Sequence, residues 1–95
     1  MISRKDAIWS IGYDGNTAIV DKAARNRYGR LTTMQLAEAG FFRAAAASAL
    51  YNESDTELAD VTEVYNRISG SSYPVDAIPR LFGVARVNAD KIKVL

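Results

Sequence analysis

Four cations lie within nine residues of this chain, and this basic segment is its clearest candidate for binding chemistry. They are Lys22, Arg25, Arg27 and Arg30, with Tyr28 between the last two and no acidic residue among them. Lysine and arginine can neutralise phosphates, and an aromatic ring can stack on a base. The segment therefore predicts contact with nucleic acid or another polyanion.

The same cations also have a purely structural interpretation. Cations near the C-terminal end of a helix interact favourably with its dipole, and these could pair with acidic side chains of this chain or another. Residues 1–50 hold seven Lys and Arg against four Asp and Glu, while residues 51–95 hold five against seven. Nucleic-acid-binding domains usually have a stronger basic excess. Polyanion binding is therefore the second of two functional hypotheses.

Nothing in the sequence indicates catalysis or a cofactor. The chain has no histidine and no cysteine, which excludes Cys/His metal sites and removes the commonest general base. The glycines form no phosphate-binding motif, and Asp14-Gly15-Asn16 is typical of a turn rather than a calcium loop. Five acidic residues follow one another as a predicted solvated face: Glu53, Asp55, Glu57, Asp60 and Glu63. We therefore expect a protein that is not an enzyme.

Residues 33–52 are similar in part to the helix-turn-helix of bacterial repressors. The similarity rests on Ala37 and Glu38 before a turn glycine, Gly40, with a second helix beyond it. Two residues separate Ala37 from Gly40, where the usual pattern has three. A recognition helix also needs polar side chains at its start, and residues 41–46 offer only Arg43. This apolar helix is better placed in a core or an interface.

The leading hypothesis is a protein–protein interaction module, most simply a homodimer. Residues 41–51 predict a helix that is apolar on nearly every side, and a few short helices would leave part of it uncovered. An edge strand at residues 91–95 offers a second route to association between chains. The predicted interface residues are Phe41, Phe42, Leu50, Tyr51, Ile92 and Val94.

Local signals predict a mainly α fold, a compact bundle of about five short helices in a single domain over residues 1–95. Capping residues place helix starts at Ser3, Thr32, Ser54 and Asp76, and glycines place helix ends. Thr32 with Gln35, and Ser54 with Glu57, each have the spacing of a capping box. A further helix is predicted from Asn16 or Thr17 to Tyr28.

Two segments allow alternatives. Residues 3–12 favour a short helix, but Trp9, Ile11 and Tyr13 alternate with polar or small residues and allow a hairpin over residues 7–20. That alternative would make the fold α+β. At the other end, residues 84–87 and 91–95 predict a small hairpin or an extended tail.

Bulk properties set the broad class. Ninety-five residues with 48% apolar and 24% charged residues are typical of one globular domain, and a net charge of +1 predicts no particular partner. No apolar run approaches the roughly 18 residues that span a bilayer. We expect no signal peptide, and the absence of cysteine suits a cytoplasmic protein.

Overall fold

The computed structural model describes residues 2–85, 89 and 91–95. The chain divides into two compact units, which are described separately. The sheet unit comprises residues 1–30 and 87–95, and the helical unit comprises residues 31–86. The prediction that residues 1–95 form one domain stays a prediction.

The sheet unit begins with a short helix, α1 (Arg4–Ile8), at the predicted start. Ser3 caps it, because its hydroxyl accepts a hydrogen bond from the amide of Asp6 at 3.4 Å. The helix ends at Ile8, well before Gly12, and β1 (Ser10–Asp14) follows. The predicted helix over residues 3–12 is therefore wrong beyond Ile8.

The alternative hairpin is confirmed for residues 10–20. β1 pairs antiparallel with β2 (Thr17–Val20) through a turn in which Gly15 has a φ of +60°. The predicted helix from Asn16 or Thr17 is consequently too long, because α2 runs only from Lys22 to Tyr28. Its start is set by Asp21, whose carboxylate accepts from the amide of Ala24 at 3.1 Å.

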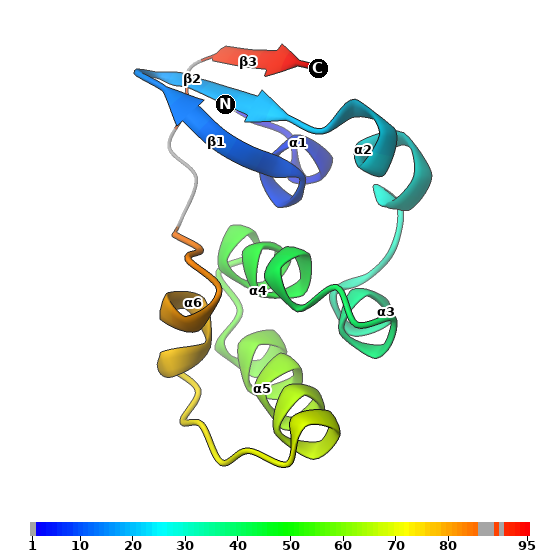
Figure 1. Ribbon diagram of the computed structural model, residues 1–95, viewed down its shortest axis with the longest axis vertical. Coiled ribbons are helices and arrows are strands. Elements are labelled where there is room, and N and C mark those ends of the chain that lie inside the picture. Colours follow the sequence, from blue (N-terminus) through cyan, green and yellow to red (C-terminus); the bar gives the residue numbers. More distant parts are fainter. Residues whose placement is uncertain (1, 86–88, 90) are drawn as a thin grey trace. The chain divides into compact units, whose positions relative to one another are not determined.

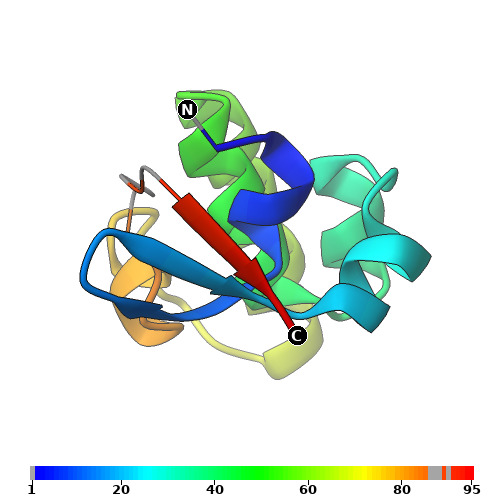
Figure 2. The same cartoon turned by 90° about the horizontal axis from the view of Figure 1, so that it is seen from above.

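The C-terminal strand joins the same sheet. β3 (Lys91–Val94) pairs parallel with β2, so that the strand order is β1-β2-β3. The predicted C-terminal hairpin is therefore wrong about the partner of residues 91–95. Its other arm, residues 84–87, lies partly outside the described residues. In Figures 1 and 2, α1 covers one face of this sheet, and the buried Ala18 and Val20 belong to that face.

The helical unit contains four helices: α3 (Thr33–Glu38), α4 (Phe42–Tyr51), α5 (Asp55–Ser69) and α6 (Ala77–Leu81). Thr32 and Gln35 form the predicted capping box at the start of α3. Gly70 ends α5 with a φ of +70°, a conformation that favours glycine. Asp76 precedes α6 as predicted but makes no capping hydrogen bond, and it lies 3.8 Å from Arg80 in an exposed pair instead.

The centre of the helical unit is the alanine-rich α4. All residues from Ala44 to Ala49 are buried, and α4 packs against α3, α5 and α6 (Figure 1). Leu36, Val61 and Ile78, one from each of these neighbours, are fully buried. Small side chains allow helices to approach closely, so the low polarity of α4 is accounted for by its central position.

Polar side chains also connect the helices of this unit. Thr33 on α3 donates a hydrogen bond to the carboxylate of Glu57 on α5. Because a hydroxyl has one proton to donate, Ser48 on α4 must donate to Thr33 across their 2.7 Å contact. Asn52 donates to the same carboxylate at 3.0 Å. The sequence predicts Glu57 on a solvated face and in a capping box, but it is half-buried and connects three helices.

The described residues thus form a mixed α/β structure with six helices and a three-stranded sheet. The prediction of mainly α structure holds only coarsely, and the bundle of about five helices is not confirmed. None of the described helices is long and apolar enough to cross a membrane.

The hydroxyl of Thr33 gives a stability prediction. Thr33→Val keeps the shape of the side chain but removes the group between Ser48 and Glu57, so we expect unfolding free energy to fall by roughly 1–3 kcal/mol. Urea unfolding measures this. Thr56→Val, at an exposed position on α5, is the control and should change stability by no more than about 0.5 kcal/mol. If the two variants lower the free energy of unfolding equally, the hydrogen bonds of the Thr33 hydroxyl do not contribute to stability.

Candidate functional site

The predicted basic segment lies on and just after α2, but its four cations have different surroundings. Lys22 and Arg27 are exposed on the helix, and Arg30 is exposed beyond its end. Arg25 is largely covered, with a side chain that is 19% exposed. Three of the four predicted cations are therefore accessible on the sheet unit, and the fourth has a structural partner.

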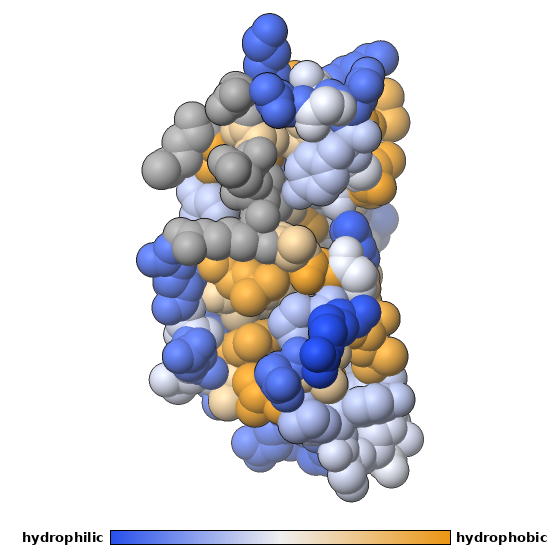
Figure 3. Space-filling view, turned by 90° about the vertical axis from the view of Figure 1, so that its left-hand side faces the viewer, coloured by the Kyte–Doolittle hydropathy of each residue, from blue (hydrophilic) through white to orange (hydrophobic). Residues whose placement is uncertain are grey.

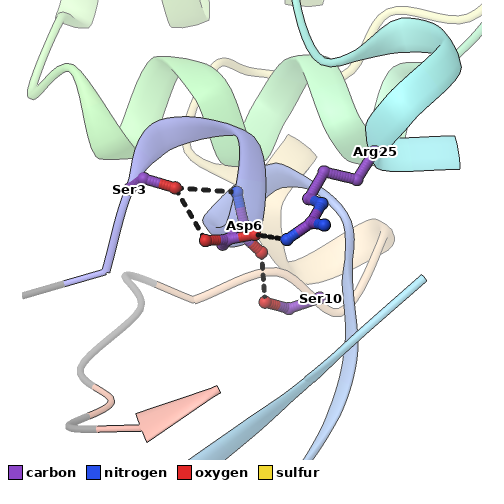
Figure 4. Close-up of polar contacts among 4 residues, drawn as sticks. All are labelled: Ser3, Asp6, Ser10 and Arg25. Atoms are coloured by element: carbon purple, nitrogen blue, oxygen red, sulfur yellow. Dashed lines mark hydrogen bonds and ion pairs between the residues drawn. The ribbon is translucent and has the colours of Figure 1, made fainter. Parts of the chain in front are cut away.

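That partner is Asp6 on α1 (Figure 4). Nη1 of Arg25 lies 2.9 Å from Oδ1 of Asp6, whose other carboxylate oxygen accepts from the Ser3 hydroxyl at 2.8 Å. The Ser10 hydroxyl donates to the main-chain carbonyl of Asp6 at 2.7 Å. Burial acts to raise the pKa of the Asp6 carboxyl, but the hydrogen bonds from Arg25 and Ser3, with the charges of Arg25 and Lys5, outweigh it. The pKa of Asp6 therefore lies below its ordinary value.

The same contact between helices brings two further cations to the end of α2. Arg4 on α1 donates to the carbonyl of Gly29 at 3.4 Å. Lys5 also lies against Gly29: a Cβ at that position would be 3.2 Å from the Cβ of Lys5 and would collide with the carbonyl of Arg25. The carbonyl of Arg25 thus excludes a side chain at position 29, and the missing side chain leaves room for Lys5. Sequence reasoning missed Arg4 and Lys5 because they join the segment through folding rather than through spacing.

Tyr28 is less available than predicted. Its ring is half-buried and lies 5.7 Å from the ring of Trp9, centroid to centroid. The guanidinium of Arg27 lies 5.4 Å from the centroid of the Tyr28 ring, within cation–π range. Tyr28 thus supports Arg27 and packs on Trp9, and stacking on a base would require it to give up these contacts.

Charge is distributed unequally between the two units. The sheet unit has eight Lys and Arg against four Asp and Glu, a net charge of +4. The helical unit has four against seven, a net charge of −3, and the two add to the +1 of the chain. A near-neutral chain therefore contains a distinctly basic unit. Comparing the two halves of the sequence gives a smaller difference in net charge than comparing the two units.

The six predicted interface residues are divided between the two units. Phe41, Phe42, Leu50 and Tyr51 are half-buried in the helical unit. Ile92, which is exposed, and Val94, which is half-buried, lie on β3 in the sheet unit.

Phe42 belongs to an aromatic cluster in the helical unit. Its ring lies 5.0 Å from that of Tyr65, which also contacts the rings of Phe82 at 5.2 Å and Tyr73 at 5.9 Å. The side chain of Asn66 fixes the loop that carries Tyr73, through two hydrogen bonds to the main chain of that residue at 2.9 and 3.0 Å. Figure 3 shows apolar residues exposed between hydrophilic ones on the side where α6 lies.

The five residues of the predicted acidic face lie on α5 and just before it. Within the residues that the structure describes, no three acidic side chains are grouped closely enough to hold a metal ion. Glu53 and Asp55 border a cavity of about 240 Å³ whose apolar walls are Ala49, Leu50 and Leu58.

Comparison with known proteins gives no family: no protein-family model, no curated protein and no solved structure matches this chain. The geometry of the basic surface therefore carries the functional argument. This surface, hereafter the α1–α2 basic surface, consists of Arg4, Lys5, Lys22, Arg27 and Arg30.

The ion pair between Asp6 and Arg25 predicts a pH-dependent stability. Because the pKa of Asp6 is lower in the folded chain than in the unfolded one, its contribution is present at neutral pH and disappears as pH falls through the folded-state value. Asp6→Asn should reduce the free energy of unfolding by about 1–3 kcal/mol near pH 7, and the difference from the parent should shrink towards about pH 3. Urea unfolding at both pH values measures this.

Asp76→Asn is the matched control, because the pair of Asp76 with Arg80 is exposed on both sides. Such pairs contribute roughly 0–1 kcal/mol. A pH dependence for Asp6→Asn no larger than that of the control would contradict the assignment.

Proposed function

We propose that this protein is a non-enzymatic binding protein whose α1–α2 basic surface contacts the phosphate backbone of a nucleic acid. The observation that carries the proposal is the contact of α1 with the end of α2, which adds Arg4 and Lys5 to the cations of the basic segment. Clustered cations with few neighbouring acids are the electrostatic footprint of nucleic-acid binding.

The ion pair of Asp6 supports the same proposal. Asp6 is the only acidic residue of α1, and Arg25 neutralises it while remaining largely covered. The exposed cations are thereby spared a competing carboxylate on that helix. Because the side chains that would contact nucleic acid are flexible Lys and Arg with no base-reading geometry, the binding we propose is to phosphates and is independent of sequence.

Removing exposed cations should weaken binding and reduce its dependence on salt. Arg27→Ala with Arg30→Ala should lower affinity for short DNA and RNA oligonucleotides, and the slope of log K against log salt should fall by about 0.9 for each phosphate that the variant no longer neutralises. Lys5→Ala should weaken binding further, which the basic segment alone would not predict. Fluorescence anisotropy from about 50 to 200 mM salt measures these effects.

The control is Arg67→Ala with Arg80→Ala, which removes the same charge from exposed positions of the helical unit. Arg25 is unsuitable as a binding variant because its removal would leave Asp6 without its ion pair. Absence of binding at about 50 mM salt, or equal weakening in test and control variants, would exclude the proposal.

Self-association is the second candidate function. It is favoured by the number of large apolar side chains exposed on the sheet unit: Ile11 is 56% exposed, Tyr13 54%, Ile92 41% and Leu95 63%. Apolar side chains of this size are available to contribute to a protein interface. A homodimer would cover them in two copies at once.

Sedimentation equilibrium tests this second candidate. We expect the average mass to rise from that of a monomer towards that of a dimer as concentration reaches the high micromolar range, and Leu95→Lys with Ile11→Lys to reverse this. A chain that stays monomeric throughout that range does not self-associate.

A further inference from the structure

The outer edge of β3 has a chemical pattern that points to a particular kind of partner. β3 is the last strand in the order β1-β2-β3, so among the described residues its second side has no neighbouring strand (Figures 1 and 2). Three of its four residues are exposed. Such an edge is a template for an additional strand.

The hydrogen bonds on the inner side of β3 show which main-chain groups face outward. The amide of Lys91 donates to the carbonyl of Asn16 at 3.3 Å, and that of Leu95 donates to the carbonyl of Val20 at 3.0 Å. Alternate residues of a strand direct their N–H and C=O groups to opposite sides, so Ile92 and Val94 direct theirs away from β2. These two residues can accept and donate four hydrogen bonds to an added strand.

The side chains of β3 alternate as strictly as its main chain. The register places Ile92 beside Ala18 and Val94 beside Val20, on the face that α1 covers. Lys91 and Lys93 lie beside Thr17 and Ile19 on the other face. A strand added at this edge would therefore meet two lysines on one face and two apolar side chains on the other.

The lysines argue against a second β3 as the added strand. Hydrogen-bonded antiparallel pairing must match outward-facing residues. A register with Val94 opposite Val94 leaves Ile92 without a partner, so a pairing that uses both residues or Ile92 alone places Ile92 opposite Ile92 or Val94. The first register sets Lys91 opposite Lys93, and the second sets Lys93 opposite Lys93. Like charges directly opposite one another destabilise a strand pair.

The other edge of the sheet is less suitable. β1 has a shift in register between Ser10 and Gly12, and such a bulge twists an edge and interrupts its hydrogen-bonding row. β3 is regular over its four residues. The geometry therefore selects β3 as the edge for strand addition.

We propose that the outer edge of β3 binds an extended acidic peptide in which acidic and apolar residues alternate. The main chain of the peptide bonds to Ile92 and Val94, its acidic side chains lie beside Lys91 and Lys93, and its apolar side chains extend the α1-covered face. Main-chain bonds supply affinity, and the alternation supplies specificity. This site is separate from the α1–α2 basic surface and does not depend on nucleic-acid binding.

A pair of synthetic peptides of identical composition tests the proposal on the full chain. One has the alternating order Glu-Val-Glu-Val-Glu-Val, and the other has the block order Glu-Glu-Glu-Val-Val-Val. We expect the alternating peptide to bind at least about tenfold more tightly by fluorescence anisotropy. N-methylation of its alternate amides should abolish that advantage. Equal binding of the two orders would reduce the interaction to simple charge attraction and overturn the proposal.

Reversal of charge on the protein provides the second arm. Lys91→Glu with Lys93→Glu should no longer bind the alternating acidic peptide and should instead prefer Lys-Val-Lys-Val-Lys-Val, which also shows that the variant still folds. Arg67→Glu with Arg80→Glu makes the same change of net charge on exposed positions of the helical unit and should leave the preference unaltered. If this control switches preference equally, long-range charge rather than the β3 edge selects the peptide.

Discussion

The ion pair between Asp6 and Arg25 is the interaction on which the sheet unit depends. It joins α1 to α2 across 19 positions of sequence, and both side chains are largely covered, so each would be a poorly solvated charge without the other. Ser3 both caps α1 and donates to the same carboxylate, which ties the start of the helix to the ion pair. The close approach at Gly29 extends the contact to the far end of α2. This contact places Arg4 and Lys5 beside the cations of α2 and so completes the α1–α2 basic surface.

The helical unit is likewise joined by polar side chains, here two hydroxyls and one carboxylate. Ser48, Thr33 and Glu57 form a directed series of hydrogen bonds that crosses from α4 through α3 to α5. Ser48 is fully buried in the middle of an alanine-rich helix, where a hydroxyl would be unfavourable without a partner. Alanines let the helices approach closely. They do little to fix how far α4 is shifted along its neighbours, because successive alanines present the same small side chain. We infer that the polar series fixes the register that the alanines leave open.

Local chemistry explains which elements can be predicted from the sequence. Ser3, Thr32 and Ser54 each cap a helix through an amide three residues ahead, and the structure confirms all three predicted starts. Thr17 to Val20 fits a helix by sequence because its apolar residues suit both periods, and its two partner strands decide the outcome. β3 pairs parallel with β2, a contact between distant segments that leaves no local signal. The basic surface shows the same difference between local and distant signals. The spacing of Lys22, Arg27 and Arg30 is enough to predict accessible cations, whereas the contribution of Arg4 and Lys5 depends on the contact between helices.

The net charge of this chain does not describe its electrostatics, because the fold separates basic and acidic residues into different units. The basic unit is assembled from both ends of the sequence, since β3 brings Lys91 and Lys93 to a sheet whose other strands lie within the first 20 residues. The acidic residues are concentrated in the segment between, most of them on or beside α5. Averaging along the sequence therefore mixes two surfaces of opposite sign, while an approaching ligand experiences each surface through the local field within about 10 Å at moderate salt. A net charge of +1 is accordingly compatible with a strongly basic binding surface.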